Sequence, residues 1–199
     1  YELNVSCPHA DRGGILIGSD PEAVSGIVAA ARRATKKPLI VKLNAGVSRI
    51  EAIARAAADA GADALILDLE DAVAPGAKPA AREMAAEYLR GKSDVWVRVN
   101  PVDSEYWEAD LDAIVPSRPA GIMLPKPRHA RDAVRLSERI DELEGHHAIE
   151  HGSTRIIALC TEHPEALFTL HSYVGTVPRL AGLSWGAEDL SAAVGASTN

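Results

Sequence analysis

The chain has 199 residues, of which 47% are hydrophobic and 25% charged, an ordinary composition for one soluble globular domain. Its net charge of −7 gives no reason to expect a nucleic acid or an anionic membrane as a partner, and the sequence has no apolar run near the roughly 20 residues that span a bilayer. The two cysteines, Cys7 and Cys160, form no spaced pair, so we expect two free thiols and a cytoplasmic location.

Short apolar segments alternate with amphipathic helical patterns along the chain. Continuous apolar character favours parallel strands that are buried on both faces, and seven such segments occur, at Glu2–Ser6, Leu39–Leu43, Ala64–Leu69, Val95–Asn100, Gly121–Leu124, Arg155–Cys160 and Ala181–Trp185. Helices are predicted at Pro21–Thr35, Ile50–Ala60, Lys78–Arg90, Ala130–Leu143 and Pro164–Tyr173. The predicted helix caps are Ser19-Asp20 and Ser48, and Gly61 is a predicted helix stop.

The strands recur about every 30 residues, which is the length of a βα unit. Seven units in a row favour a TIM (β/α) barrel over a doubly wound open sheet. A complete barrel has eight units and about 250 residues. The sequence therefore predicts a single α/β domain over residues 1–199 that forms an incomplete TIM barrel.

Polar side chains follow the strand ends in almost every unit. The carboxyl ends of barrel strands form the face on which barrel enzymes carry their chemistry, so the repetition favours an enzyme over a bland scaffold. The residues are Asn4, Ser6, Cys7, Lys42, Asn44, Asp68, Glu70, Asp71, Arg98, Asn100, Lys126, Glu162, Glu188 and Asp189.

Five motifs over residues 61–199 occur in an order and at a spacing that identify a family resemblance. They read LILDLEDAV, VRVNP, GIMLPK, IIALCTE and GLSWGAEDLSAAVG. Together they resemble the citrate lyase β-subunit / HpcH-HpaI aldolase family. The resemblance implies a TIM-barrel, magnesium-dependent carbon–carbon lyase that cleaves a hydroxy acid or its acyl-CoA thioester.

The same resemblance implies roles for individual residues. It places Mg²⁺ on Glu162 and Asp189, and carboxylates are the oxygen ligands that this ion prefers. Arg98 is expected to bind a substrate carboxylate with its planar fork; the alternative is a salt bridge to Asp68, Glu70 or Asp71.

Three further residues are expected to support this site. Glu70 and Asp71 would position metal-bound water or the arginine. Lys126 would contact substrate or neutralise charge. All the site side chains are expected to converge on one face of the barrel.

Residues 1–60 resemble a different family. YELNVSCPH, Gly13-Gly14, SDPEAV and PLIVKLN are similar to class 1 dihydroorotate dehydrogenases, which bind FMN. The resemblance implies that Asn4 contacts a pyrimidine, Cys7 acts as a base and Lys42 contacts the flavin. The later part of the chain lacks the glycine-rich phosphate loops of that family, so the flavin site is expected to be incomplete.

The two resemblances meet near AGADAL, at residues 60–65. We therefore expect a natural or engineered chimera or a fragment, with an assembly artefact as the alternative. An FMN-dependent oxidoreductase and a non-catalytic scaffold are the rival functions. Seven strands also predict an open sheet with exposed edges, and hence a homo-oligomer.

Overall fold

The computed structural model describes residues 1–7 and 14–196, without the side chains of residues 15, 187 and 188. The chain divides into two compact units, Tyr1–Arg98 and Val99–Asn199. This boundary follows a strand and does not coincide with the change of family resemblance near residue 60.

The first unit contains four parallel strands in chain order. They are β1 (Glu2–Asn4), β2 (Ile40–Asn44), β3 (Ala64–Asp68) and β4 (Val95–Arg98). In β2 and β3 every residue after the first is buried, as expected for parallel strands covered on both faces. The register aligns Asn44 with Asp68 and Asp68 with Arg98, so these polar residues meet at the carboxyl ends of the strands.

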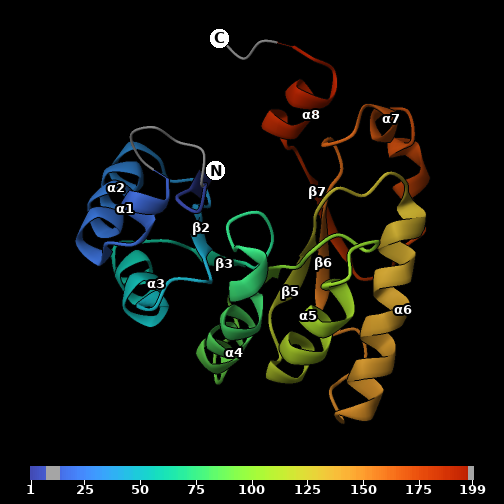
Figure 1. Ribbon diagram of the computed structural model, residues 1–199, viewed down its shortest axis with the longest axis horizontal. Coiled ribbons are helices and arrows are strands. Elements are labelled where there is room, and N and C mark those ends of the chain that lie inside the picture. Colours follow the sequence, from blue (N-terminus) through green and yellow to red (C-terminus); the bar gives the residue numbers. More distant parts are fainter. Residues whose placement is uncertain (8–13, 197–199) are drawn as a thin grey trace. The chain divides into compact units, whose positions relative to one another are not determined.

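Helices cover the first unit's strands (Figure 1), and their bounds are α1 (Ile15–Gly18), α2 (Pro21–Ala34), α3 (Ile50–Asp59), η1 (Pro75–Ala77) and α4 (Lys78–Leu89). Asp20 caps α2 by accepting a hydrogen bond from the Glu22 amide at 3.1 Å, as predicted. The predicted Ser48 cap is wrong, because Arg49 is the residue that precedes α3 and no side chain caps it. Gly61, with φ of 106°, ends this helix as predicted.

The second unit contains the parallel strands β5 (Gly121–Leu124), β6 (Arg155–Leu159) and β7 (Leu180–Ser184). Its helical elements are α5 (Trp107–Ile114), η2 (Val115–Ser117), α6 (Ala130–His146), α7 (Pro164–Leu167), η3 (Leu170–Tyr173) and α8 (Ala187–Ala193). Figure 1 shows α6 as the long helix of this unit. The predicted helix Pro164–Tyr173 is two short pieces, α7 and η3.

The described residues contain all seven predicted strands, each followed by helical structure. This confirms the predicted fold class, an α/β barrel that is incomplete. Among the helices that the structure describes, none is both long enough and apolar enough to cross a bilayer.

Candidate functional site

The first unit holds a buried acid–arginine cluster at the ends of β3 and β4. Arg98 donates from Nε to Asp68 Oδ1 at 2.9 Å and from Nη2 to Asp68 Oδ2 at 2.6 Å. Its Nη1 lies 2.9 Å from Glu70 Oε2. The two contacts of Nε and Nη2 with the Asp68 carboxylate form the bidentate geometry in which arginine commonly binds a carboxylate. The salt bridge foreseen as the alternative role of Arg98 is therefore present, with Asp68 and Glu70 as its partners.

The charge state of Asp68 follows from these contacts. Burial of its side chain favours the neutral acid and raises the pKa, but the charge and hydrogen bonds of Arg98 outweigh burial and hold the pKa below its usual value. The Glu70 amide also donates to Asp68 Oδ1, at 3.0 Å. Asp68 is therefore a carboxylate near neutral pH and fixes the orientation of the guanidinium.

The loop after β3 is held by a lysine. Lys78, the first residue of α4, is 5% exposed and donates from Nζ to the carbonyls of Leu69 at 2.8 Å and Glu70 at 3.0 Å. Its ammonium thus fixes the backbone that carries Glu70. Asp71 is exposed to solvent, so it lies on the outer side of this loop. Its predicted supporting role remains a prediction.

The three residues that resemble a flavin site lie in and just after β1 and β2. Lys42 is 6% exposed, and its Nζ lies 2.8 Å from Glu2 Oε1. Asn4 Oδ1 accepts hydrogen bonds from the backbone and hydroxyl of Ser6. Cys7 is a half-buried free thiol. The pairing of Lys42 with Glu2 gives this lysine a partner inside the protein, a feature that the resemblance did not indicate.

In the second unit, Lys126 contacts both predicted metal ligands. Its backbone amide donates to Glu162 Oε2 at 2.5 Å, and its Nζ lies 3.7 Å from Asp189 Oδ1. Lys126 has a φ of 51°, an uncommon value for a residue other than glycine. Strained backbone of this kind tends to occur at functional sites, where the surroundings hold it in place.

Glu162 is 2% exposed and packs against the loop that precedes α8. A Cβ added at Gly186 would lie 2.8 Å from Glu162 Cγ, so this approach requires a glycine. Thr161 ties the same loop down: its hydroxyl accepts from the Gly186 amide at 2.8 Å and lies 3.2 Å from the Gly186 carbonyl oxygen. The Glu162 carboxylate is thereby held between the Lys126 amide and a glycine backbone.

The oxygen donors in the second unit fit a hard divalent cation. Within the described residues there is no group of three or more His, Cys, Asp or Glu side chains that could hold a metal ion. Two carboxylates, Glu162 and Asp189, both touch one lysine. Magnesium in proteins is typically bound by one or two carboxylates and keeps several positions for water and substrate, so these two side chains are of the ligand type that the ion uses.

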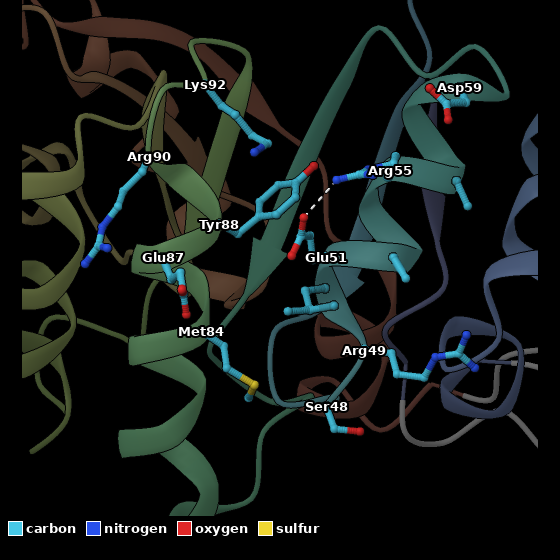
Figure 2. A pocket seen from close by; sticks show the side chains of 13 residues that line it. Ser48, Arg49, Glu51, Arg55, Asp59, Met84, Glu87, Tyr88, Arg90 and Lys92 are labelled. Atoms are coloured by element: carbon cyan, nitrogen blue, oxygen red, sulfur yellow. Dashed lines mark hydrogen bonds and ion pairs between the residues drawn. The ribbon is translucent and has the colours of Figure 1, made fainter.

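A groove of about 850 Å³ lies away from these residues, between α3 and α4 of the first unit. Figure 2 shows its mixed lining, in which Arg55 pairs with Glu51 at 2.8 Å and the Tyr88 ring lies beside Lys92. Opposite charges are interleaved along two exposed helices, which is the pattern of a solvated helix surface. None of the strand-end residues lines it, so we do not place the chemistry there.

The structure thus gathers the predicted residues into two clusters, one in each unit. Asp68, Glu70 and Arg98 form the first cluster, and Lys126, Glu162 and Asp189 form the second. Sequence reasoning assigned no role to Gly186 or to Ser6. A glycine two residues after the seventh strand was the available signal for Gly186.

Comparison with known proteins finds two families along the chain, and their matches overlap at residues 47–68. Residues 47–199 match the family model of HpcH/HpaI aldolase/citrate lyase, and residues 1–68 match the model of dihydroorotate dehydrogenase. The catalytic subunit of dihydroorotate dehydrogenase B from Pelobacter propionicus is 58% identical over 66 residues, which are 33% of this chain and 22% of that protein. Citrate lyase subunit beta from Haemophilus influenzae is 34% identical over 131 residues, 64% of this chain and 45% of that protein.

Solved structures similar to this chain include proteins of Mycobacterium tuberculosis. CitE in complex with magnesium and acetoacetate is 30% identical, with a TM-score of 0.64 over 81% of this chain and 59% of that one. The citrate lyase beta subunit complexed with oxaloacetate and magnesium is 30% identical, with a TM-score of 0.63 over 80% and 62%. The chain spans less than half of the curated relatives and about 60% of these structures.

Proposed function

Because the chain belongs to the HpcH/HpaI aldolase/citrate lyase family, we propose that it is a magnesium-dependent carbon–carbon lyase. Its substrate is a small organic hydroxy acid or the acyl-CoA thioester of such an acid. The observation that carries the proposal is the contact of Lys126, after β5, with both Glu162, after β6, and Asp189, in α8. The related M. tuberculosis proteins with magnesium and acetoacetate or oxaloacetate support it.

Glu162 and Asp189 hold the magnesium ion in this proposal. Bound there, the ion would supply Lewis-acid polarisation of a substrate carbonyl group. The Lys126 amide and the Gly186 backbone keep Glu162 in one orientation, which avoids reorganisation of this ligand. The Lys126 ammonium neutralises part of the local negative charge.

Arg98 contributes to substrate binding in this proposal. Its fixed positive charge and planar donors suit a substrate carboxylate. Asp68 and Glu70 hold the guanidinium and prevent its rotation.

The metal site is tested first by calorimetric titration of magnesium into the full chain. We expect saturable binding that is at least about tenfold weaker in Glu162→Gln and in Asp189→Asn, since each substitution removes one anionic ligand. Glu165→Gln is the matched control, because Glu165 is exposed and pairs with Arg128. Equal affinity in the wild type and Glu162→Gln would exclude this metal site.

Activity is then tested with a panel of hydroxy acids and their CoA thioesters. We expect magnesium-dependent cleavage that Arg98→Lys reduces through a higher KM, because lysine cannot form the bidentate contact. A panel without any cleaved substrate, in a chain that binds magnesium at Glu162, would support the scaffold alternative.

A further inference from the structure

Ser6 connects the first strand to the acid–arginine cluster. It lies within residues 1–68, which match dihydroorotate dehydrogenase, whereas Arg98 lies only within the segment that matches the lyase family. Ser6 is 1% exposed, and its hydroxyl lies 3.1 Å from Asp68 Oδ2 and 2.8 Å from Asn4 Oδ1. A side chain two residues after the first strand therefore contacts the carboxylate that holds Arg98.

Asp68 uses its full hydrogen-bonding capacity in this arrangement. An ionised carboxylate offers about four acceptor positions, two on each oxygen. Among the described residues, Oδ1 accepts from Arg98 Nε and the Glu70 amide, and Oδ2 accepts from Arg98 Nη2 and the Ser6 hydroxyl. Each oxygen thus has two donors. Ser6 supplies the fourth, and its loss would leave a buried acceptor position empty.

Asn4 competes with Asp68 for the single Ser6 proton. The Ser6 amide also donates to Asn4 Oδ1, at 3.1 Å, which fixes the amide oxygen beside the hydroxyl. A hydrogen bond to an ionised carboxylate is roughly twice as strong as one to a neutral amide. The proton therefore favours Asp68, and Asn4 weakens that bond without abolishing it.

We propose that Ser6 is a positioning residue for Arg98. Its hydroxyl fixes the plane of the Asp68 carboxylate. The carboxylate in turn orients the Arg98 guanidinium through their bidentate contact. A residue that lies outside the lyase-family match thereby sets the direction of the arginine. The consequence for substrate rests on the proposed function, in which Arg98 binds a carboxylate; the positioning itself does not.

The first test measures hydrogen exchange of the Arg98 Nε–H by nitrogen-15 NMR in the full chain. Ser6→Ala should speed exchange about tenfold, which corresponds to the loss of one hydrogen bond to a charged group. Ser6→Thr retains a hydroxyl and should restore slow exchange. Asn4→Ala removes the competing acceptor on an exposed residue, so exchange should become slower than in the wild type.

The two alanine variants are expected to change the exchange rate in opposite directions, and this separates positioning of Arg98 from a general loss of packing. A purely structural role would speed exchange in both alanine variants, and that result would overturn the proposal. Unchanged exchange in Ser6→Ala would also overturn it. If Ser6→Ala does not fold, Asn4→Ala decides alone: slower exchange supports the proposal, and unchanged or faster exchange rejects it.

A second readout links the positioning to the proposed function. With magnesium present, Ser6→Ala should weaken oxaloacetate binding about tenfold and leave magnesium affinity unchanged, since Glu162 and Asp189 are untouched. If the wild type does not bind oxaloacetate, the proposed role of Arg98 fails, while the exchange measurement still decides the role of Ser6.

Discussion

The close contact between Gly186 and Glu162 leads to a prediction for substitution of the glycine. In Gly186→Ala the new Cβ would meet Glu162 Cγ at 2.8 Å and force a buried side chain to move. We expect magnesium affinity to fall about tenfold and stability to fall by about 1–3 kcal/mol, the usual cost of overpacking. Calorimetry and urea unfolding measure both.

Gly182→Ala is the matched control, because a Cβ at this β7 residue would meet nothing within 4 Å. It should leave magnesium affinity unchanged. A similar loss of affinity in both variants would mean that Gly186 does not act through Glu162.

Glu144 predicts how stability depends on pH. Burial raises the pKa of this carboxyl, but hydrogen bonds from Arg179 and from the amides of Thr154 and Gly152 outweigh burial and lower it from 4.5 to about 2. A lowered pKa stabilises the folded state above the ordinary value, and this contribution disappears as pH falls from about 5 towards 2. The shift corresponds to roughly 3 kcal/mol.

Urea unfolding at pH 7, 4 and 3 measures this effect. In Glu144→Gln the pH dependence should flatten and the protein should be less stable at pH 7, because the buried Arg179 loses one of its two carboxylate partners and keeps only Asp141. Glu142→Gln, on the exposed side of the same helix, should keep the wild-type slope. An unchanged slope in Glu144→Gln would exclude Glu144 as its source.

Sequence patterns identify single residues well where a motif surrounds them. The partners of Arg98 could be anticipated because Asp68 ends the neighbouring strand and Glu70 follows it. The contacts of Ser6 with Asp68 and of Lys42 with Glu2 could not, because they depend on side-chain direction at the strand ends. The conformation of Lys126 has no sequence signature either, since positive φ is unusual for lysine.

At the scale of elements, Arg32 joins the end of α2 to the turn before β3. It donates from Nη2 to the carbonyls of Thr35 and Lys37, and its Nη1 lies 2.8 Å from Asp63 Oδ2. Gly61 lies against its aliphatic stem, where an added Cβ would be 2.9 Å from Arg32 Cγ and Cδ. The turn therefore depends on a glycine with positive φ next to the arginine.

Gly61→Ala should destabilise the protein by about 1–3 kcal/mol, the cost of holding a non-glycine residue at an unfavourable φ. Gly26→Ala should have the opposite sign: this glycine lies inside α2 with no atom within 4 Å of its Cβ position, and alanine favours a helix by about 0.5–1 kcal/mol. Thermal unfolding of both variants measures the pair. A stabilised Gly61→Ala would contradict this account of the turn.

The seven strands were predictable because parallel strands buried on both faces leave continuous apolar runs. Helix α5 was not, because Asp110 interrupts its apolar stripe although the residue is buried. Asp110 accepts hydrogen bonds from the backbone and side chain of Asn100 at 2.8 and 2.6 Å. The helical pattern was therefore concealed by Asp110, a buried polar residue that accepts hydrogen bonds from a neighbouring loop.

For the molecule as a whole, the dehydrogenase-like segment leads us to expect no flavin binding. Lys42, the residue that resembles a flavin contact, is buried and paired with Glu2. A flavin that used Lys42 would have to displace Glu2, whose carboxylate already neutralises the lysine ammonium. Purified protein incubated with FMN and desalted should show no absorbance at 450 nm. Stoichiometric FMN would favour the oxidoreductase alternative.

The last prediction concerns self-association, and it rests on the exposed apolar side chains of the second unit. Leu183 and Trp185, in and just after β7, are 46% and 64% exposed, and Phe168 and Val174 are 81% and 85% exposed. Soluble monomers rarely expose large contiguous apolar patches, and such patches mark interfaces or aggregation sites. Single exposed apolar residues are ordinary, but here the exposure extends to a strand. Every residue of β7 retains access to solvent on one face or the other, whereas β5 is fully buried.

We therefore expect the apparent mass from light scattering to rise with protein concentration. Trp185→Ser should reduce this rise, because it removes the largest of these exposed side chains next to β7. Leu16→Ser is the matched control, since Leu16 is 74% exposed but lies in the first unit. A constant monomer mass over a hundredfold concentration range would show that these side chains do not drive association. Equal effects of the two substitutions would point to general surface hydrophobicity instead of the surface around β7.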